Sequence, residues 1–364
     1  MKKTLLILLA VLLAAALIVS CKPDVPEGGG DEPVDDGLVH VSTFTQFKNG
    51  IETAKTKELK TVVLDKDITW DADYNKNAAF TPDLTGLTID LNGHKIRDII
   101  STAFKPSGNS FTIKNGTLAL IDNSTSTYQK VIMIGFSEAL TGKDYSTPEE
   151  QAKAITFEGV TFEGTPYLGD GVFVFTDCTV RGLAQKNNRG LCCYSGYVTL
   201  NNTAVISQAH PDGSEVAIHV RETVLKLNNG TTVTSANHGI QAYNNSSLTT
   251  EGTVTVQCAG NFAVYTNYAS SYTRNDGIYH NVVNIGSGTT LRGSVKGVLA
   301  MTFGDQYTIA AGATLIGPDG TAEPKYTATS ITDAVGTANT NGYIGWSAGK
   351  GSSAGAATLT DNRT

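Results

Sequence analysis

The sequence predicts an all-β fold, a parallel β-helix (solenoid) with an N-terminal amphipathic capping helix. One observation is a strand phrase that recurs about every two dozen residues, with alternating apolar positions that end at Asn or Gly. A second is a set of companion strands at similar spacing, and a third is a Gly-rich composition with only 17% charged residues. A strand-plus-turn unit repeated in this way is one coil of a solenoid, because each coil buries its apolar face against its neighbours.

The chain begins like a secretory signal peptide. Lys2 and Lys3 precede an uncharged apolar run from Leu5 to Val19, which is shorter than the roughly 20 residues that a membrane span requires. The run ends at Ile18-Val-Ser-Cys21, which resembles the lipobox of bacterial lipoproteins. The resemblance implies that residues 1–20 are removed and that Cys21 is lipidated. An ordinary signal or an uncleaved anchor is the alternative, and Cys21 is then incidental.

The composition of residues 21–40 predicts an acidic flexible tether. The segment carries six carboxylates and a Gly28–Gly30 run, and it lacks aromatic side chains, so it cannot bury enough surface to fold. We expect it to link the acylated Cys21, and through it a lipid membrane, to a folded part in the bacterial cell envelope, periplasmic or at the cell surface. The formal net charge of −7 argues against a nucleic-acid partner, because phosphates require a basic patch.

The folded part is predicted to begin with a cap. Phe44, Phe47, Ile51 and Ala54 recur at helical spacing, and Thr43 or Thr45 can serve as the N-cap. A solenoid has an open apolar end, and an amphipathic helix before the first coil covers it.

The coils are predicted over residues 41–315, followed by a C-terminal cover and a disordered tail at 316–364. Copies of the strand phrase begin at Leu87, Phe111, Val198 and Val224. The companion strands align into two inward columns, one of Leu191, Ile218, Ile240, Phe262 and Val298, and one of Cys193, Val220, Ala242, Val264 and Ala300. An antiparallel sandwich would not produce stacked columns at coil spacing. Two insertions, which we term excursions, interrupt the repeat of the coils at 142–154 and 269–281, and such insertions often carry function.

The cap, followed by Ile89-Asp-Leu91-Asn-Gly93-His94, resembles the opening of right-handed parallel β-helix proteins of the pectin-lyase-like superfamily. The resemblance covers roughly residues 41–315 and implies right-handed coils. None of the motifs that it implies for galacturonan hydrolysis is intact. The most similar segment is Asn237-His238-Gly239, which resembles the Gly-His-Gly motif of these hydrolases but lacks the carboxylate pair that glycoside hydrolysis requires. No aspartate cluster falls on consecutive coils, so we expect no cofactor, and Ca²⁺ only if the chain is a lyase.

Four cysteines follow Cys21. Cys178, Cys193 and Cys258 fall at apolar-phase strand positions, which favours buried thiols, although an even number leaves disulfides open. A nucleophilic pair of Cys192 with His219 is the alternative, but nothing in the sequence orients the imidazole.

One outward column is the candidate ligand-binding site. Tyr194, Arg221, Tyr243 and Tyr265 are predicted to occupy the same position in successive coils, beside His219. At or after the end of this column come Tyr268, Tyr272, Arg274, Asp276 and His280. Aromatic rings with Arg form a surface that stacks on sugars or anchors a protein, whereas simple packing on a β face is the alternative.

The sequence therefore favours an extracytoplasmic lipoprotein whose β-helix is a non-catalytic binding, adhesion or structural module, for a glycan or a protein. The alternative is a polysaccharide lyase or glycoside hydrolase that acts on a uronate-containing polysaccharide. Its candidate groups are Arg221, His219, Arg274, Asp276 and His280.

Overall fold

The computed structural model describes residues 37–69, 79–98, 104–120, 130–184, 189–210, 213, 215–267, 280–294, 296–301, 304–326, 330–331, 344–346 and 357–364. Met1–Gly37 and Leu38–Thr364 are separate units, and the second is described below. The predicted signal peptide and most of the tether, including Cys21, lie outside the described residues. In the ranges given above, no helix is long and apolar enough to cross a membrane.

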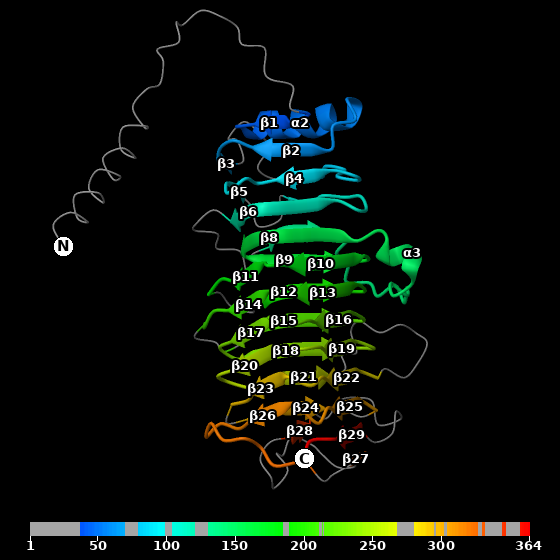
Figure 1. Ribbon diagram of the computed structural model, residues 1–364, viewed down its shortest axis with the longest axis vertical. Coiled ribbons are helices and arrows are strands. Elements are labelled where there is room, and N and C mark those ends of the chain that lie inside the picture. Colours follow the sequence, from blue (N-terminus) through cyan, green and yellow to red (C-terminus); the bar gives the residue numbers. More distant parts are fainter. Residues whose placement is uncertain are drawn as a thin grey trace, which may run out of the picture. The chain divides into compact units, whose positions relative to one another are not determined.

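The strands of these ranges form two sheets, of 21 and 8 strands, and their coils stack along the unit (Figure 1). The larger sheet supplies two walls of each coil, because strands β6 (Thr112–Leu120) and β8 (Ile155–Glu163) bend from one wall to the next. The smaller sheet supplies the third wall. From β6 onward, the chain thus passes through the first, second and third wall in turn before it enters the next coil.

The first wall contains β1 (Val39–Val41), β2 (Thr61–Leu64), β4 (Thr88–Asp90), β10 (Val172–Thr176), β13 (Tyr197–Asn201), β16 (Val224–Leu227), β19 (Ser247–Thr250), β22 (Val282–Ile285), β25 (Gln306–Ile309) and β29 (Ala357–Asp361). The second wall contains β3 (Ile68–Thr69), β5 (Lys95–Asp98), β11 (Thr179–Gly182), β14 (Ala204–Ser207), β17 (Thr232–Ser235), β20 (Val254–Cys258), β23 (Thr289–Arg292) and β26 (Thr314–Ile316). The third wall contains β7 (Lys130–Ile134), β9 (Thr165–Gly169), β12 (Arg189–Tyr194), β15 (Val216–Arg221), β18 (His238–Tyr243), β21 (Val264–Asn267), β24 (Leu299–Met301) and β28 (Ile344–Trp346).

The ladders along all three walls are parallel, as those between β10 and β13 and between β15 and β18 illustrate. Strand β27 (Ser330–Ile331) instead pairs antiparallel with β29 at the C-terminal end of the coils. The predicted parallel β-helix is confirmed. The right-handed sense of the coils stays a prediction, which the strong general preference for right-handed crossovers supports.

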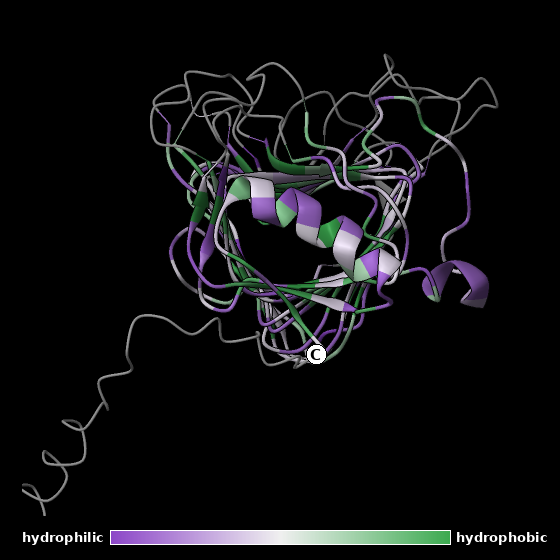
Figure 2. Ribbon diagram, turned by 90° about the horizontal axis from the view of Figure 1, so that it is seen from above, coloured by the Kyte–Doolittle hydropathy of each residue, from purple (hydrophilic) through white to green (hydrophobic). Residues whose placement is uncertain are grey.

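Helix α2 (Phe44–Thr56) lies across the N-terminal end of the coils (Figure 2). The Thr43 side chain accepts a hydrogen bond from the Gln46 amide and so caps the helix, as predicted. Phe47, Ile51 and Ala54 are at most 1% exposed and cover the apolar interior of the first coil.

The interior is a continuous apolar core that follows the predicted alternation. Its aromatic part lies around β8 and β10, where the ring centroids of Phe157 and Phe175 are 4.8 Å apart. Below this part, Val198, Leu200 and Leu225 continue the core with no exposed surface. Stacked apolar positions of period two therefore fix which face of each strand points outward.

Part of the predicted register on the third wall is wrong. Leu191, Ile218 and Ile240 stack as predicted, but Ile240 pairs with Val264 rather than with Phe262, and Val264 pairs with Leu299. The corner between β20 and β21 is longer than the preceding one. The first change is a shift of two residues, which keeps the same faces inward and outward, so the apolar pattern does not detect it. The second is a shift of one residue from the predicted stacking of Val264 with Ala300: Ala300, predicted to point inward, pairs with the outward Tyr265.

The C-terminal segment also differs from expectation. The disordered tail was predicted to reach Thr364, yet Ala357–Asp361 forms β29, which pairs with β25. Leu359 is fully buried there and supplies the apolar side chain that anchors the strand. Arg363 donates hydrogen bonds to the carbonyl oxygens of Glu323 and Pro324 and fixes the last residues.

Candidate ligand-binding face

Two rows of outward side chains run along the third wall. The first row is Met133, Tyr167, Cys192, His219, Gln241 and Tyr265. The second row is Tyr194, Arg221, Tyr243 and Asn267. Tyr194, Arg221 and Tyr243 are stacked as predicted, whereas Tyr265 belongs to the neighbouring row because of the two-residue register shift.

Tyr194, His219 and Arg221 form the centre of this face. The Tyr194 hydroxyl lies 3.2 Å from His219 Nε2, and Arg221 Nε donates to the same nitrogen at 3.3 Å. The Arg221 guanidinium carbon lies 4.6 Å from the ring centroid of Tyr194 and 5.6 Å from that of Tyr243. These cation–π contacts hold the guanidinium between two rings.

The imidazole of His219 is kept neutral. Burial lowers its pKa well below the usual value, and the neighbouring Arg189 and Arg221 lower it further. His219 Nδ1 lies 3.1 Å from Gln241 Oε1, an acceptor, so Nδ1 carries the proton and Nε2 accepts from Arg221. The network has one consistent arrangement of donors and acceptors.

The centre is buried, although we expected an exposed strip. Phe136 packs on Tyr167 and Tyr194, with ring centroids 5.0 and 4.9 Å away. The segment after Phe136 is tied to the coils by its own amides: that of Thr141 donates to Ser195 Oγ, and that of Gly142 to a Glu222 carboxylate oxygen. The exposed fractions are 3% for Tyr194, 3% for His219 and 8% for Arg221.

Further along the wall, four rings form what we term the aromatic patch, made of His238, Tyr243, Phe262 and Tyr265. All four are half-buried. The Phe262 and Tyr265 rings stack at 6.1 Å with an interplanar angle of 11°, and His238 lies 5.1 Å from Tyr265. Tyr243 meets Tyr265 edge-on at 6.1 Å. The patch presents partly exposed ring surface directly beside the buried centre.

Cys178, Cys193 and Cys258 belong to the apolar core, whereas Cys192 packs with Tyr167 and Tyr194 on the outward face of the third wall. Cys178, Cys192, Cys193 and Cys258 are free and buried in the structure. Cys192 Sγ lies 3.4 Å from Arg189 Nη1, and burial raises the pKa of its thiol despite this cation. The sulfur contacts Arg189 rather than a base, which does not fit a nucleophilic pair with His219.

Of the remaining predicted site residues, Tyr268, Tyr272, Arg274 and Asp276 lie outside the described residues. His280 is half-buried at the corner before β22, where its amide donates to Asn245 Oδ1 at 3.0 Å. In the described ranges no group of three His, Cys, Asp or Glu side chains is placed to hold a metal ion.

Sequence reasoning missed five residues of this face: Phe136, Tyr167, Arg189, His238 and Phe262. The sequence pattern could have predicted Tyr167, because Tyr167-Leu168 repeats the outward–inward pair of Cys192-Cys193 one coil earlier. Phe262 was predicted to point inward. Phe136 lies on the covering segment, and no periodic signal marks it.

Comparisons with known proteins add little to this geometry. No protein-family model matches the sequence, and no curated protein matches it. Among solved structures, the chain is similar to the SRRP of L. reuteri 53608, with 12% sequence identity and a TM-score of 0.44. The likeness covers 89% of this chain and 99% of that one. A likeness at this level carries no conclusion about function.

Proposed function

We propose that this chain is a lipid-anchored extracytoplasmic protein whose β-helix is a non-catalytic binding module, with a glycan as its ligand. The observation that carries the proposal is the aromatic patch. The ring centroids of His238 on β18, Phe262 in the corner before β21 and Tyr265 on β21 lie within 6.3 Å of one another, and each ring keeps part of its surface exposed.

Rigidity supports the patch as a binding surface. Neighbouring coils hold its side chains through parallel ladders, so little conformational freedom is lost when a ligand binds. Tyrosine adds a polar hydroxyl to an apolar ring, and this combination suits sugars, which carry both apolar ring faces and hydroxyl groups. Gln241, which is half-buried, borders the patch and adds a polar group that orients a ligand.

The buried centre of the face does not suit a catalytic role. His219 and Arg221 hydrogen-bond to each other and are almost fully buried, whereas a general base must reach a substrate proton. The lipid anchor of the proposal rests on the lipobox at Ile18-Val-Ser-Cys21 and the acidic tether that follows it.

A glycan array tests this proposal. The full chain and a double variant, Tyr243→Ala with Tyr265→Ala, are compared on the same array and in a screen for protein partners. We expect glycan binding that the double variant loses and that Tyr197→Ala, a tyrosine of the first wall, retains. Unchanged binding by the double variant, or binding to proteins alone, contradicts the proposal.

The enzyme alternative is tested on the same preparation. Uronate-containing polysaccharides are incubated with the full chain, with and without Ca²⁺, and unsaturated products are measured by ultraviolet absorbance. Turnover that Arg221→Ala or Arg274→Ala abolishes would overturn the non-catalytic assignment.

A further inference from the structure

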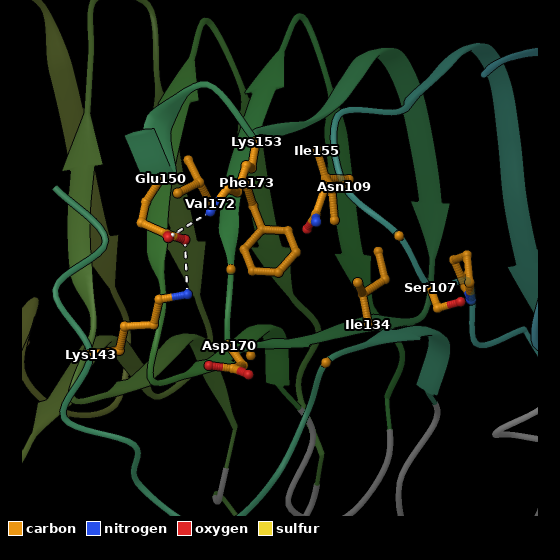
Figure 3. A pocket seen from close by; sticks show the side chains of 15 residues that line it. Ser107, Asn109, Ile134, Lys143, Glu150, Lys153, Ile155, Asp170, Val172 and Phe173 are labelled. Atoms are coloured by element: carbon orange, nitrogen blue, oxygen red, sulfur yellow. Dashed lines mark hydrogen bonds and ion pairs between the residues drawn. The ribbon is translucent and has the colours of Figure 1, made fainter. Parts of the chain in front are cut away.

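A cavity of about 240 Å³ lies away from the aromatic patch, where the chain passes from the third wall to the first (Figure 3). We term it the corner pocket. Part of its lining comes from the ends of β7 and β9 and from the starts of β8 and β10. The segment before β6 adds Ser107 and Asn109, and the excursion that contains helix α3 (Pro148–Gln151) adds Lys143, Glu150 and Lys153. Its polar side chains are Ser107, Asn109, Lys143, Glu150, Lys153 and Asp170.

The excursion is fixed to the coils on both sides of the pocket. Ser110 bonds to it twice, from Oγ to the Ala152 carbonyl oxygen at 2.9 Å and from its amide to the Lys153 carbonyl oxygen at 3.1 Å. On the other side, the buried Tyr145 donates its hydroxyl hydrogen to Asp170 Oδ1. These contacts make the pocket a built feature of the fold.

The charges that line the pocket balance. Glu150 lies between two lysines, with Lys143 Nζ 2.9 Å and Lys153 Nζ 2.8 Å from its oxygens, as the dashed lines in Figure 3 show. Asp170 adds a second carboxylate at the exposed rim. Two ammonium groups and two carboxylates leave no net charge, and an anionic ligand would meet both carboxylates at once.

The remaining polar groups of the corner pocket suit a ligand that carries hydroxyl groups. Asp170 uses Oδ1 for Tyr145, and Oδ2 accepts no hydrogen bond from any residue that the structure describes. The exposed Asn109 amide and Ser107 hydroxyl both donate and accept. Such a mixture of donors and acceptors without net charge recognises a neutral, hydroxyl-rich molecule.

We propose that the corner pocket binds one neutral saccharide unit, either free or at the end of a glycan. The volume of about 240 Å³ is below the roughly 300 Å³ at which pockets for drug-sized ligands begin, so it accommodates one sugar ring rather than a chain. The site is independent of the aromatic patch, since it uses other residues on other elements. Its affinity is weak, in the millimolar range, because a small ligand with few contacts gains little binding energy.

Saturation-transfer NMR on the full chain tests this proposal. The probes are glucose, galactose, mannose and N-acetylglucosamine as neutral sugars, with glucuronate, galacturonate and inorganic phosphate as anions. We expect at least one neutral sugar to bind. Asn109→Trp fills the mouth of the pocket and is expected to abolish binding, whereas Thr232→Trp, on an exposed position of β17, leaves it unchanged.

A second variant keeps the proposal testable if Asn109→Trp disturbs the fold around the mouth of the pocket. Asp170→Asn keeps a residue that tolerates the positive φ of 51° and an oxygen that accepts from Tyr145, but it removes the carboxylate. We expect binding weaker by about fivefold, as for the loss of one good hydrogen bond.

Three results would overturn the proposal: no neutral sugar binds, only uronates or phosphate bind, or Asn109→Trp binds like the wild type. The variant Tyr243→Ala with Tyr265→Ala is measured in parallel and should keep its monosaccharide signal. Failure of the corner pocket is thereby distinguished from failure of the aromatic patch.

Discussion

Arg221 Nε lies 3.3 Å from His219 Nε2 on the outward face of β15, and both side chains are almost fully buried. A donor that cannot lose its proton thus faces a nitrogen that must accept. The pair fixes a neutral imidazole in the middle of the third wall. The nearby His238 is half-buried, and the partial burial of its imidazole lowers its pKa to about 4.

The first prediction is that acid weakens the fold through His238. The unfolded chain takes up a proton below about pH 6.5, whereas the folded chain does so only near pH 4, so the free energy of unfolding falls as the pH drops through this window. Between pH 7 and pH 5 we expect His238 to lower the stability by about 2 kcal/mol. His219, whose pKa is also lowered, acts in the same direction.

Urea unfolding at pH 7 and pH 5 measures this effect. His238→Gln should lose about 2 kcal/mol less than the wild type between the two pH values. His94→Gln removes a half-buried imidazole whose Nδ1 lies 3.5 Å from Asp67 Oδ1, and it serves as the control. The same pH dependence for the wild type and His238→Gln would show that His238 is not buried in neutral form.

The second prediction concerns the thiols. Burial raises the pKa of Cys178 to about 11 and that of Cys258 to about 12, and Cys192 and Cys193 are fully buried. A thiolate is the reactive form, so we expect a disulfide reagent to label none of the four in the native protein and all four in denaturant. Thr232→Cys, on an exposed strand position, is the positive control. Rapid native labelling of Cys192 would contradict its burial on the outer face of the third wall, where it packs with Tyr167 and Tyr194.

The third prediction is that the C-terminal strand stabilises the last coils. Leu359 has no exposed surface, so Leu359→Ala should lower the free energy of unfolding by about 2–4 kcal/mol. Thr360→Ala, on the exposed side of the same strand, should cost about 0.5 kcal/mol or less. Chemical denaturation of both variants decides the point. Equal effects would mean that β29 does not pack on the core.

The fourth prediction tests the anchor. Cys21→Ala should move the protein from the membrane fraction to the soluble fraction and abolish incorporation of labelled fatty acid. Cys258→Ala, which leaves the lipobox intact, should behave as the wild type. A Cys21→Ala protein that stays in the membrane without acyl label would indicate an uncleaved apolar anchor instead.

The sequence predicted the coils because their signal is repetitive. The stacked positions Leu191, Ile218 and Ile240 were right, since each strand shows the same alternation at a nearly constant spacing. The prediction failed at Phe262, where a longer corner shifts the register by two residues. Both residues of the pair Phe262 and Val264 suit an inward position, so the pattern alone did not choose between them.

The character of the candidate face was harder to predict. Alternation correctly placed Tyr194, His219 and Arg221 on the outward side, but it says nothing about what covers that side. The cover includes Phe136, on a segment that leaves the repeat and returns over it. Contacts of this kind depend on the path of one non-repetitive segment, which periodicity does not encode.

The central claim is that the aromatic patch binds a glycan, and titration calorimetry with the strongest glycan from the array tests it most directly. The full chain is compared with the single variants Phe262→Ala and Tyr265→Ala and with the first-wall control Tyr197→Ala. We expect each patch variant to weaken binding by about fivefold or more, since an aromatic contact contributes about 1 kcal/mol, and we expect the control to bind as the wild type does. Wild-type affinity in both patch variants would contradict the account.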